Sequence, residues 1–294
     1  MNKSTIIVTG GAGFVASNLI RLLLSKTKFQ IMSIDNYSSG LKKNHVKSKR
    51  VKYLKGDTKN INVLIKAPKK IHSVFHFGEF ARIYQSFIHM EECLNSNSIG
   101  TNAVFKFCLK NKIKLIYSAT SASLGNKGND KNLSPYAFTK SKNLELLENL
   151  KKWFGFKYEV IYFYNVYGPR QISSGKMSTV IGIFENAFKN KKPLPVVRPG
   201  TQSRRFTHID DTIKICYLAW KKNLCRHYSI SHKKSYSILD VAKLFKTKIR
   251  FLKKRRGERY ASALTNMNLS NKVYKYFGKI SLKNYIENLV KKSI

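Results

Sequence analysis

Short apolar runs alternate with longer amphipathic stretches over the first 165 residues. The apolar runs predict strands at Thr5–Thr9, Gln30–Asp35, Val51–Leu54, Ser73–Phe77, Lys114–Ser118 and Glu159–Tyr164. Helical patterns lie between them, near Gly13–Ser25, Ile61–Ile65, Ile83–Asn111 and Pro135–Phe154. Strands that alternate with helices are typical of an α/β fold, in which crossover helices cover a doubly wound parallel sheet.

The pattern changes at about Tyr167. Prolines and glycines divide the rest of the chain into shorter elements, with helical stretches near Asp210–Trp220, Ile238–Phe245 and Ser281–Lys292. We therefore expect a first domain at residues 1–165 and a smaller, mixed α/β domain at residues 166–294. Within the second, we expect a segment of about residues 206–226 to pack back on the first domain.

A glycine-rich loop follows the first predicted strand directly. Gly10, Gly13 and Ala16 fit the spacing G-x-x-G-x-x-G/A, and a predicted helix begins in the same loop. Such glycines let backbone N–H groups approach a pyrophosphate at the helix N-terminus. Asp35 closes the second strand, where a carboxylate accepts hydrogen bonds from an adenosine ribose and repels a 2′-phosphate. The sequence therefore predicts a Rossmann sheet that binds NAD in preference to NADP.

Basic residues dominate the charge of the chain. There are 56 Lys and Arg against 15 Asp and Glu, which gives a formal net charge of +41. This charge suggests nucleic acid or an anionic membrane surface as a partner. However, 44 of the basic residues are Lys, whereas base readout favours Arg, and the charge is spread along the whole chain. We interpret the excess as codon bias and expect no specific nucleic-acid partner, although a positive field would attract anionic substrates.

The cellular setting is suggested by two further features. No apolar stretch reaches the roughly 18 residues that span a bilayer, and glycines interrupt the apolar run near the N-terminus. The four cysteines are widely spaced, without a C-x-x-C pair. Reduced thiols in a cytoplasmic protein are the simplest interpretation, and we expect no membrane span, signal peptide or metal site.

Motifs along nearly the full length resemble one family. They are Val8-Thr-Gly-Gly-Ala-Gly-Phe14, Asp35-Asn-Tyr-Ser-Ser-Gly40, Gly56-Asp57, Val74-Phe-His-Phe-Gly-Glu79, Asn97-Ser-Ile-Gly-Thr101, Ser118-Ala-Thr120, Pro135-Tyr-Ala-Phe-Thr-Lys140, Tyr164-Asn-Val-Tyr-Gly-Pro-Arg170, Gln202-Ser-Arg-Arg-Phe206, His208-Ile-Asp-Asp211 and Arg255-Arg-Gly-Glu258. Each motif is modest alone, but their shared order is specific. The chain resembles the extended short-chain dehydrogenase/reductases that act on nucleotide sugars, a family that includes UDP-glucose 4-epimerase.

The resemblance implies two sets of binding residues. It implies cofactor contacts at Gly10, Gly13, Phe14, Val15, Asp35, Asn36, Ser39, Gly40, Asp57, Thr58, Phe77, Gly78, Glu79, Tyr136 and Lys140. It implies nucleotide-sugar contacts, drawn equally from the two domains, at Arg82, Asn97, Thr120, Asn165, Val196, Arg204, Arg255 and Glu258. Arginine suits a diphosphate because its planar fork of donors matches the oxygens.

Three residues are the expected catalytic groups. Tyr136 and Lys140 stand at i and i+4 on a predicted helix, so both side chains lie on one face. An ammonium beside a phenol lowers the pKa of the phenol and makes it a usable base near neutral pH. By the strand-end signature of the family, Thr120 is the matching hydroxyl, five residues before Gly125, with Ser118 and Ser121 as alternatives.

The residues after Thr120 separate the reactions of the family. Nucleotide-sugar 4,6-dehydratases carry an Asp-Glu pair there, whereas this chain has Ser121 and Ala122. We therefore expect an NAD-dependent epimerase that inverts C4 of a UDP-hexose through a transient 4-keto sugar. Alternatives are a dehydratase, decarboxylase or 4-keto reductase of the family, or a non-catalytic NAD-binding protein that uses its basic surface on RNA or lipid.

The chain departs from the family pattern at several positions. Gly78-Glu79 replaces the usual Ala-Ala, and a carboxylate there could contact the nicotinamide ribose or the sugar. Tyr162 and Arg205 replace a usual Arg and Asp, and Asn268 stands where an Asp is expected. These departures leave the identity of the sugar open.

The family also implies an assembly. Two of its helices pair into a four-helix dimer interface, and the matching stretches here are Ile83–Asn111 and Pro135–Phe154. Apolar stripes on them comprise Phe87, Leu94, Phe105 and Cys108, and Leu144, Leu147 and Leu150. We expect a homodimer, although the same stripes could simply pack on the sheet.

Overall fold

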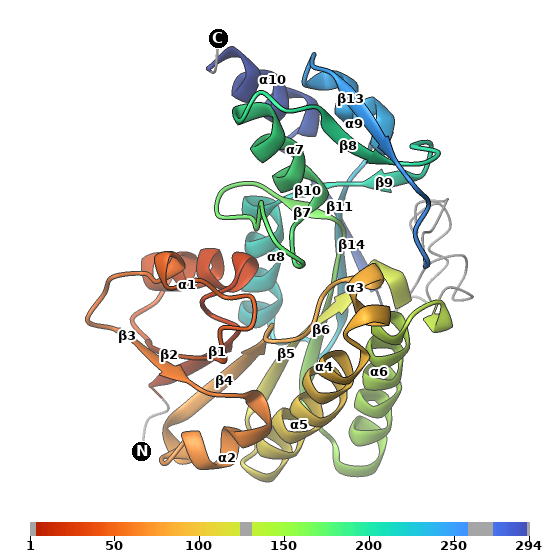
Figure 1. Ribbon diagram of the computed structural model, residues 1–294. Coiled ribbons are helices and arrows are strands. Elements are labelled where there is room, and N and C mark those ends of the chain that lie inside the picture. The colour runs from red at the N-terminus through yellow and green to blue at the C-terminus, as the bar shows by residue number, and fades with distance from the viewer. Residues whose placement is uncertain (1–3, 124–130, 258–272, 293–294) are drawn as a thin grey trace.

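An eight-stranded parallel sheet forms the centre of the computed structural model, which describes residues 4–123, 131–257 and 273–292 (Figure 1). Its strands are β1 (Thr5–Thr9), β2 (Gln30–Asp35), β3 (Val51–Lys55), β4 (Ile71–His76), β5 (Lys114–Thr120), β6 (Tyr158–Phe163), β11 (His227–His232) and β14 (Val273–Gly278). Their order is β14-β11-β6-β5-β4-β1-β2-β3. The order reverses between β1 and β4, and the crevice at such a switch point is where doubly wound sheets bind ligands. The predicted fold class is confirmed.

Helices cover both faces of this sheet (Figure 1). On one face α1 (Phe14–Lys26) packs beside α8 (Ile209–Lys222), and on the other lie α2 (Ile61–Leu64), α5 (Thr101–Lys110) and α6 (Pro135–Phe154). Ile6 and Val8 belong to the core under α1, whereas Ile7 belongs to the opposite core. A strand buried on both faces is apolar without interruption, which explains the run Ile6–Val8.

Helix α6 has clear signals at both ends. Ser134 caps it by accepting a hydrogen bond from the Ala137 N–H at 3.1 Å, and Pro135 occupies its first turn. Gly155 ends it in the left-handed conformation, with φ of 65°. The helix therefore has the predicted bounds, and it carries both Tyr136 and Lys140.

The predicted single helix over Ile83–Asn111 is wrong, because this stretch is divided. It forms α3 (Ile83–Ile88), α4 (Met90–Leu94), a π-helical turn η4 (Asn95–Gly100) and α5. Within the π turn, the buried Asn97 side chain bonds both the N–H and the carbonyl of Phe80, at 2.7 and 3.0 Å. These long-range bonds favour the local widening of the helix.

The later part of the chain builds a smaller unit and also extends the main sheet. The remaining strands are β7 (Val166–Tyr167), β8 (Leu194–Val197), β9 (Ser203–Arg205), β10 (Thr207–His208), β12 (Ser235–Ser237) and β13 (Ile249–Leu252). The remaining helices are α7 (Val180–Lys189), α9 (Ile238–Leu244), α10 (Leu282–Lys291) and the short 3₁₀ turns η1 (Lys42–Asn44), η2 (Thr58–Asn60) and η3 (Pro68–Lys70). Strands β11 and β14 join the central sheet, while α7, α9, α10 and β8 share a separate apolar core.

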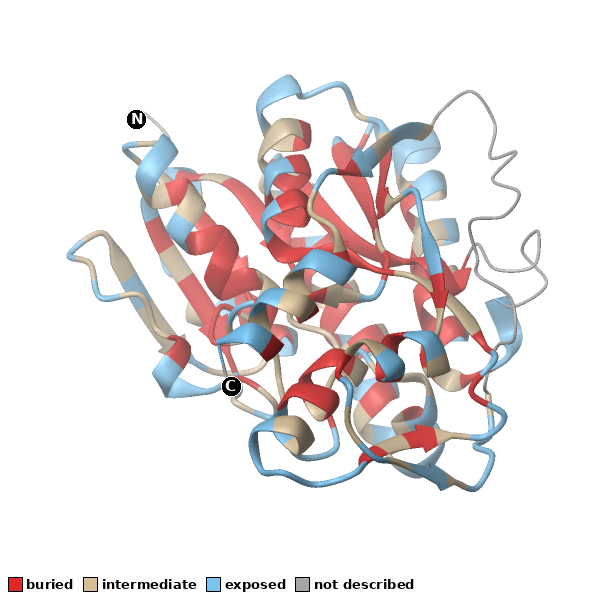
Figure 2. Cartoon of the chain, turned by 90° about the horizontal axis from the view of Figure 1, so that it is seen from above, coloured by how far each residue is buried: buried red, intermediate tan, exposed pale blue. Residues whose placement is uncertain are grey.

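Buried residues gather along the central strands and the inner sides of the helices, and a second group lies inside the smaller unit (Figure 2). Among the described residues, no helix combines the length and apolarity needed to cross a membrane.

Candidate active site

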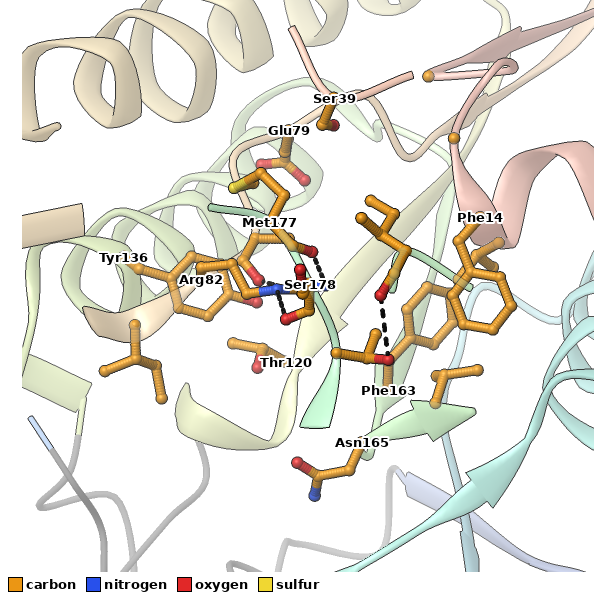
Figure 3. Close-up of a pocket in the computed structure, with 18 of the residues that line it drawn as sticks. Phe14, Ser39, Glu79, Arg82, Thr120, Tyr136, Phe163, Asn165, Met177 and Ser178 are labelled. Atoms are coloured by element: carbon orange, nitrogen blue, oxygen red, sulfur yellow. Dashed lines mark hydrogen bonds between the residues drawn. The ribbon is translucent and has the colours of Figure 1, made fainter. Parts of the chain in front are cut away.

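A cavity of about 510 Å³ lies where the carboxyl ends of the central strands face the smaller unit. Its sheet wall includes Gly10, Gly78 and Thr120, and its opposite wall includes Met177 and Arg204. Figure 3 shows side chains from both walls directed toward the same space. Segments far apart in the sequence therefore build one site.

The glycine loop forms one end of the cavity. Gly10 has a φ of 71°, and a Cβ atom there would lie 2.8 Å from the Gly78 Cα. Gly13 is the N-cap residue of α1 and has no side chain to cap the helix, and the first-turn residues Phe14 and Val15 line the cavity. A helix N-terminus of this kind attracts phosphate.

Asp35 lies at the same end with its carboxylate fixed. One oxygen accepts the Ala12 N–H at 2.9 Å and the other accepts the Tyr37 N–H at 2.8 Å. Burial raises the pKa of this carboxyl, and these two hydrogen bonds oppose the rise. Gly40 leaves room for the Asp35 carboxylate, because a Cβ atom at this position would lie only 2.7 Å from it. Two carboxylate oxygens beside a close-packed glycine loop fit a dinucleotide such as NAD.

Tyr136 and Thr120 occupy the middle of the cavity. The Tyr136 ring packs in a buried cluster with Phe80 and Met177. Thr120 ends β5, and Figure 3 shows it on the same side of the cavity as Tyr136. The expected base and the expected hydroxyl therefore lie on one wall.

Lys140 has a partner that its sequence motif does not predict. Its ammonium forms an ion pair with Glu79 and donates to the Ser118 carbonyl at 2.5 Å. Burial lowers the pKa of Lys140, and the Glu79 carboxylate opposes that shift. The sequence indicates Glu79 as a site residue only because it follows β4. That position predicts a contact with the cofactor or the sugar, whereas the structure pairs Glu79 with Lys140.

Arg82 brings a second cation to the phenol. Its guanidinium donates to the carbonyls of Ser178 at 3.1 Å and Met177 at 2.5 Å, and it lies beside Tyr136 (Figure 3). Burial lowers the pKa of Arg82, and the charge of the nearby Tyr136 opposes that shift. Arg82 was expected only as a substrate contact.

The cavity brings together most of the residues expected from the sequence. Those that line it are Gly10, Gly13, Phe14, Val15, Asp35, Asn36, Ser39, Asp57, Thr58, Phe77, Gly78, Glu79, Arg82, Thr120, Tyr136, Lys140, Asn165, Arg204 and Arg255. Gly40, Asn97 and Val196 lie outside its lining, and the latter two are buried in the interior. Pro195 and Val197 line the cavity in place of Val196, as the alternation of a strand requires. Glu258, Gly125 and Asn268 lie outside the described residues.

Other lining residues were not expected. Phe163 ends β6, and the ends of parallel strands are a general signal for such a position. Met177, Ser178 and Thr179 reach the cavity from the segment before α7, and nothing in their local sequence indicates it.

Comparisons with known proteins agree with this geometry. A model of the NAD dependent epimerase/dehydratase family matches residues 6–231. The ADP-L-glycero-D-manno-heptose-6-epimerase of Brachyspira hyodysenteriae is 29% identical over 227 residues, which cover 71% of this chain and 70% of that protein.

Two crystal structures share the fold. The UDP-glucose 4-epimerase of Thermotoga maritima with UDP-glucose has a TM-score of 0.84 at 22% identity, covering 98% of this chain and 97% of that chain. The dTDP-glucose 4,6-dehydratase of Streptomyces venezuelae, with NAD bound, has a TM-score of 0.85 at 18% identity, covering 98% and 96%. The family match spans most of the sequence, and the residues that carried the resemblance line one cavity. The chain belongs to the NAD dependent epimerase/dehydratase family.

Proposed function

We propose that this protein is an NAD-dependent epimerase that inverts C4 of a nucleotide-linked hexose, with UDP as the nucleotide. The observation that carries the proposal is the wall formed by Thr120, Tyr136 and Lys140 beside the glycine loop and Asp35. NAD is the cofactor of the family, and when bound it supplies reversible hydride transfer at the sugar carbon.

The residues of the wall would handle the proton. The Tyr136 phenolate accepts the proton of the C4 hydroxyl and later returns it, while Thr120 hydrogen-bonds the same oxygen. Lys140 contacts the ribose of the cofactor, and the Arg82 guanidinium stabilises the phenolate by its charge. Because the proton that leaves is also the one that returns, this cycle needs no path to bulk water.

The opposite end of the cavity supports a nucleoside diphosphate. Arg204 and Arg255 both line it, and the Arg255 guanidinium lies 5.2 Å from the centre of the Tyr84 ring. A stacked arginine is partly ordered before a ligand arrives, which suits recognition of a diphosphate. The name of the Thermotoga maritima structure, a UDP-glucose 4-epimerase, favours UDP over other nucleotides.

The acidic residues of the wall argue against dehydration. Among the described residues that line the cavity, the carboxylates are Asp35, Asp57 and Glu79. The first two lie at the glycine-loop end, and the third is paired with Lys140. Elimination of water needs an additional acid and base beside Thr120, where Ser121 and Ala122 are buried and uncharged.

The assembly we propose is a homodimer through the faces of α3 to α6. Phe105, Cys108 and Leu147 of the expected stripes are buried in the sheet core. Two other residues of the expected stripes, Phe87 and Leu94, are exposed, and so are apolar side chains outside the stripes on these helices, namely Ile88, Met90, Ile99, Phe138, Trp153 and Phe154. Exposed apolar side chains on neighbouring helices are the kind of surface that binds a second copy of the chain. All four cysteines are free thiols, and we propose a cytoplasmic location.

The test is incubation with a panel of UDP-, dTDP-, GDP- and ADP-sugars, with products identified by mass spectrometry and NMR. We expect a product of unchanged mass with inverted C4 from a UDP-hexose. Loss of 18 mass units would identify a dehydratase instead, and loss of 44 a decarboxylase.

A further inference from the structure

Glu79 is a buried carboxylate at the centre of the catalytic wall. It follows β4 by three residues, and its side chain is 2% exposed, with that of its partner Lys140 at 4%. The family pattern places a small apolar residue here, so the carboxylate is a feature of this chain. A buried charge is costly unless it is paired and hydrogen-bonded.

The hydrogen bonds around Glu79 come from donors only. Oε1 accepts from the Thr101 hydroxyl at 2.9 Å and from the Tyr117 hydroxyl at 3.1 Å, and Oε2 accepts from Lys140. The Ser118 hydroxyl and the Asn143 amide lie farther away, each at 3.5 Å. This set matches an ionised carboxylate, which accepts hydrogen bonds and donates none.

A directed chain of hydrogen bonds ends on Oε1. Thr9 Oγ1 accepts from the N–H groups of Phe77 at 3.0 Å and Gly78 at 2.9 Å, so its own hydrogen is left for His76 Nδ1 at 2.8 Å. Because burial lowers the pKa of His76 to about 4, the ring is neutral. Its proton must then be on Nε2, which donates to Thr101 at 2.9 Å. Thr101 in turn donates to Glu79.

Three other titratable groups around Lys140 are neutral near pH 7, namely His76 on β4, Cys93 on α4 and Tyr117 on β5. Tyr136, on the same helix as Lys140, is the group that exchanges a proton in the proposed cycle. Burial raises the pKa of Cys93 to about 11 and raises that of Tyr117 well above its ordinary value. Among the described residues whose charges act on Lys140, Glu79 is therefore the one that carries a compensating negative charge.

We propose that Glu79 is a positioning residue for Lys140, one that keeps the buried ammonium charged and directed at the catalytic wall. This proposal rests on the proposed function, because it takes from it that Lys140 contacts the cofactor ribose and acts beside the Tyr136 phenol. A buried ammonium without a counter-charge loses its proton readily, and the pKa of such lysines can fall by several units. Without Glu79, Lys140 would be neutral over part of the range in which the enzyme must work.

The test compares wild type and Glu79→Gln in turnover and in NAD affinity across a pH series from 6 to 9.5. Glutamine keeps the size of the side chain and an acceptor oxygen but removes the charge. We expect the alkaline limb of both profiles to move to lower pH by at least about one unit. At pH 9 the variant should be at least about tenfold weaker relative to wild type than at pH 6.5. An alkaline limb in the wild-type position would overturn the proposal.

A second buried pair offers a matched control. Glu159 is fully buried, lies 3.3 Å from Lys114, and accepts the N–H groups of Cys225 and Arg226. It lies outside the lining of the cavity, so Glu159→Gln should lower stability without moving either pH profile. If Glu159→Gln moved the profiles as far as Glu79→Gln, the shift would reflect general destabilisation and the proposal would fail.

Glu79→Asp covers the case in which the glutamine variant does not fold. It keeps the charge on a shorter side chain, so turnover should fall while the alkaline limb stays within about half a unit of wild type. A limb displaced by a full unit in this variant would contradict the proposal. The measurement of NAD affinity needs no sugar. A shifted pH profile of NAD affinity in Glu79→Gln would therefore support the role of Glu79 even if the protein epimerised no nucleotide sugar.

Discussion

Asp35→Asn tests the cofactor end of the site. Both oxygens of Asp35 already accept a backbone N–H, from Ala12 and from Tyr37, so each has one acceptor position left for a ribose hydroxyl. An asparagine must turn its NH₂ group toward one of these N–H groups. The substitution therefore removes the charge, one acceptor for the ribose and one anchor of the glycine loop together.

The magnitude follows from those contacts. A hydrogen bond to a charged group contributes about 1.5–3 kcal/mol, and the variant loses one such bond to the ribose and weakens another. We expect NAD affinity to fall by about 3 kcal/mol, on the order of a hundredfold. Affinity for NADP should change much less, because the lost charge no longer repels the 2′-phosphate.

The assay is calorimetric titration of wild type and variant with NAD and NADP. Wild type should prefer NAD at least about tenfold, and the variant should bind both within about threefold. Because burial raises the pKa of Asp35, wild-type NAD affinity should also weaken as pH falls and the carboxylate becomes protonated, beginning at a higher pH than for an ordinary aspartate. Asp240→Asn is the control, since Asp240 is exposed and caps α9 with Ser237. Equal wild-type affinity for the two dinucleotides would refute the reasoning.

Three further predictions concern catalysis and assembly. Tyr136→Phe should fold, bind NAD and lose at least about a hundredfold in turnover. Tyr162→Phe, which removes a hydroxyl 3.1 Å from His227, should lose about 1 kcal/mol of stability and keep its turnover. Equal turnover in the two variants would exclude Tyr136 as the base. Arg82→Gln should move the acid limb of the turnover profile to higher pH, because a cation beside the phenol stabilises the phenolate. An acid limb in the wild-type position would mean that Arg82 only holds the carbonyls of Met177 and Ser178 in place. By light scattering at micromolar concentration, the wild type should be a dimer and Ile99→Glu should be a monomer, because Ile99 is 55% exposed on the proposed interface. A monomeric wild type would refute the proposed dimer.

The elements that the sequence predicts best carry their signals locally. Strands β1 and β2 have the predicted bounds because their apolar runs, interrupted in β2 only by Ser33, end at a glycine loop and at Asp35. Helix α6 has them because Ser134, Pro135 and Gly155 mark its ends. Capping residues and hydrophobic runs therefore suffice to predict the bounds of an element when the residues that determine those bounds lie within or next to it.

Other elements depend on distant partners. Strand β11 reads His-Tyr-Ser-Ile-Ser-His, with too few apolar residues to predict a buried strand, and it forms because β6 and β14 flank it. In the π turn η4, the Asn97 side chain bonds Phe80, which lies 17 residues earlier. Neither partner is recognisable from the local sequence.

The site divides in the same way. Motifs placed Gly10, Asp35, Thr120 and Tyr136 on the cavity, because the ends of parallel strands meet at one edge of a sheet. The pairing of Lys140 with Glu79 joins residues 61 positions apart and was not predicted. Side-chain pairing is decided by tertiary packing, so sequence motifs predict where a residue lies better than what it contacts.

Deuterium at C4 of the substrate tests the central claim most directly. UDP-hexose labelled with deuterium at C4 would be incubated with the enzyme in ordinary water, and the product analysed by NMR and mass spectrometry. We predict an epimer of unchanged mass that keeps its deuterium at the inverted C4, because the hydride that leaves this carbon also returns to it. Deuterium lost to solvent, or a product lighter by 18 or 44 mass units, would contradict it.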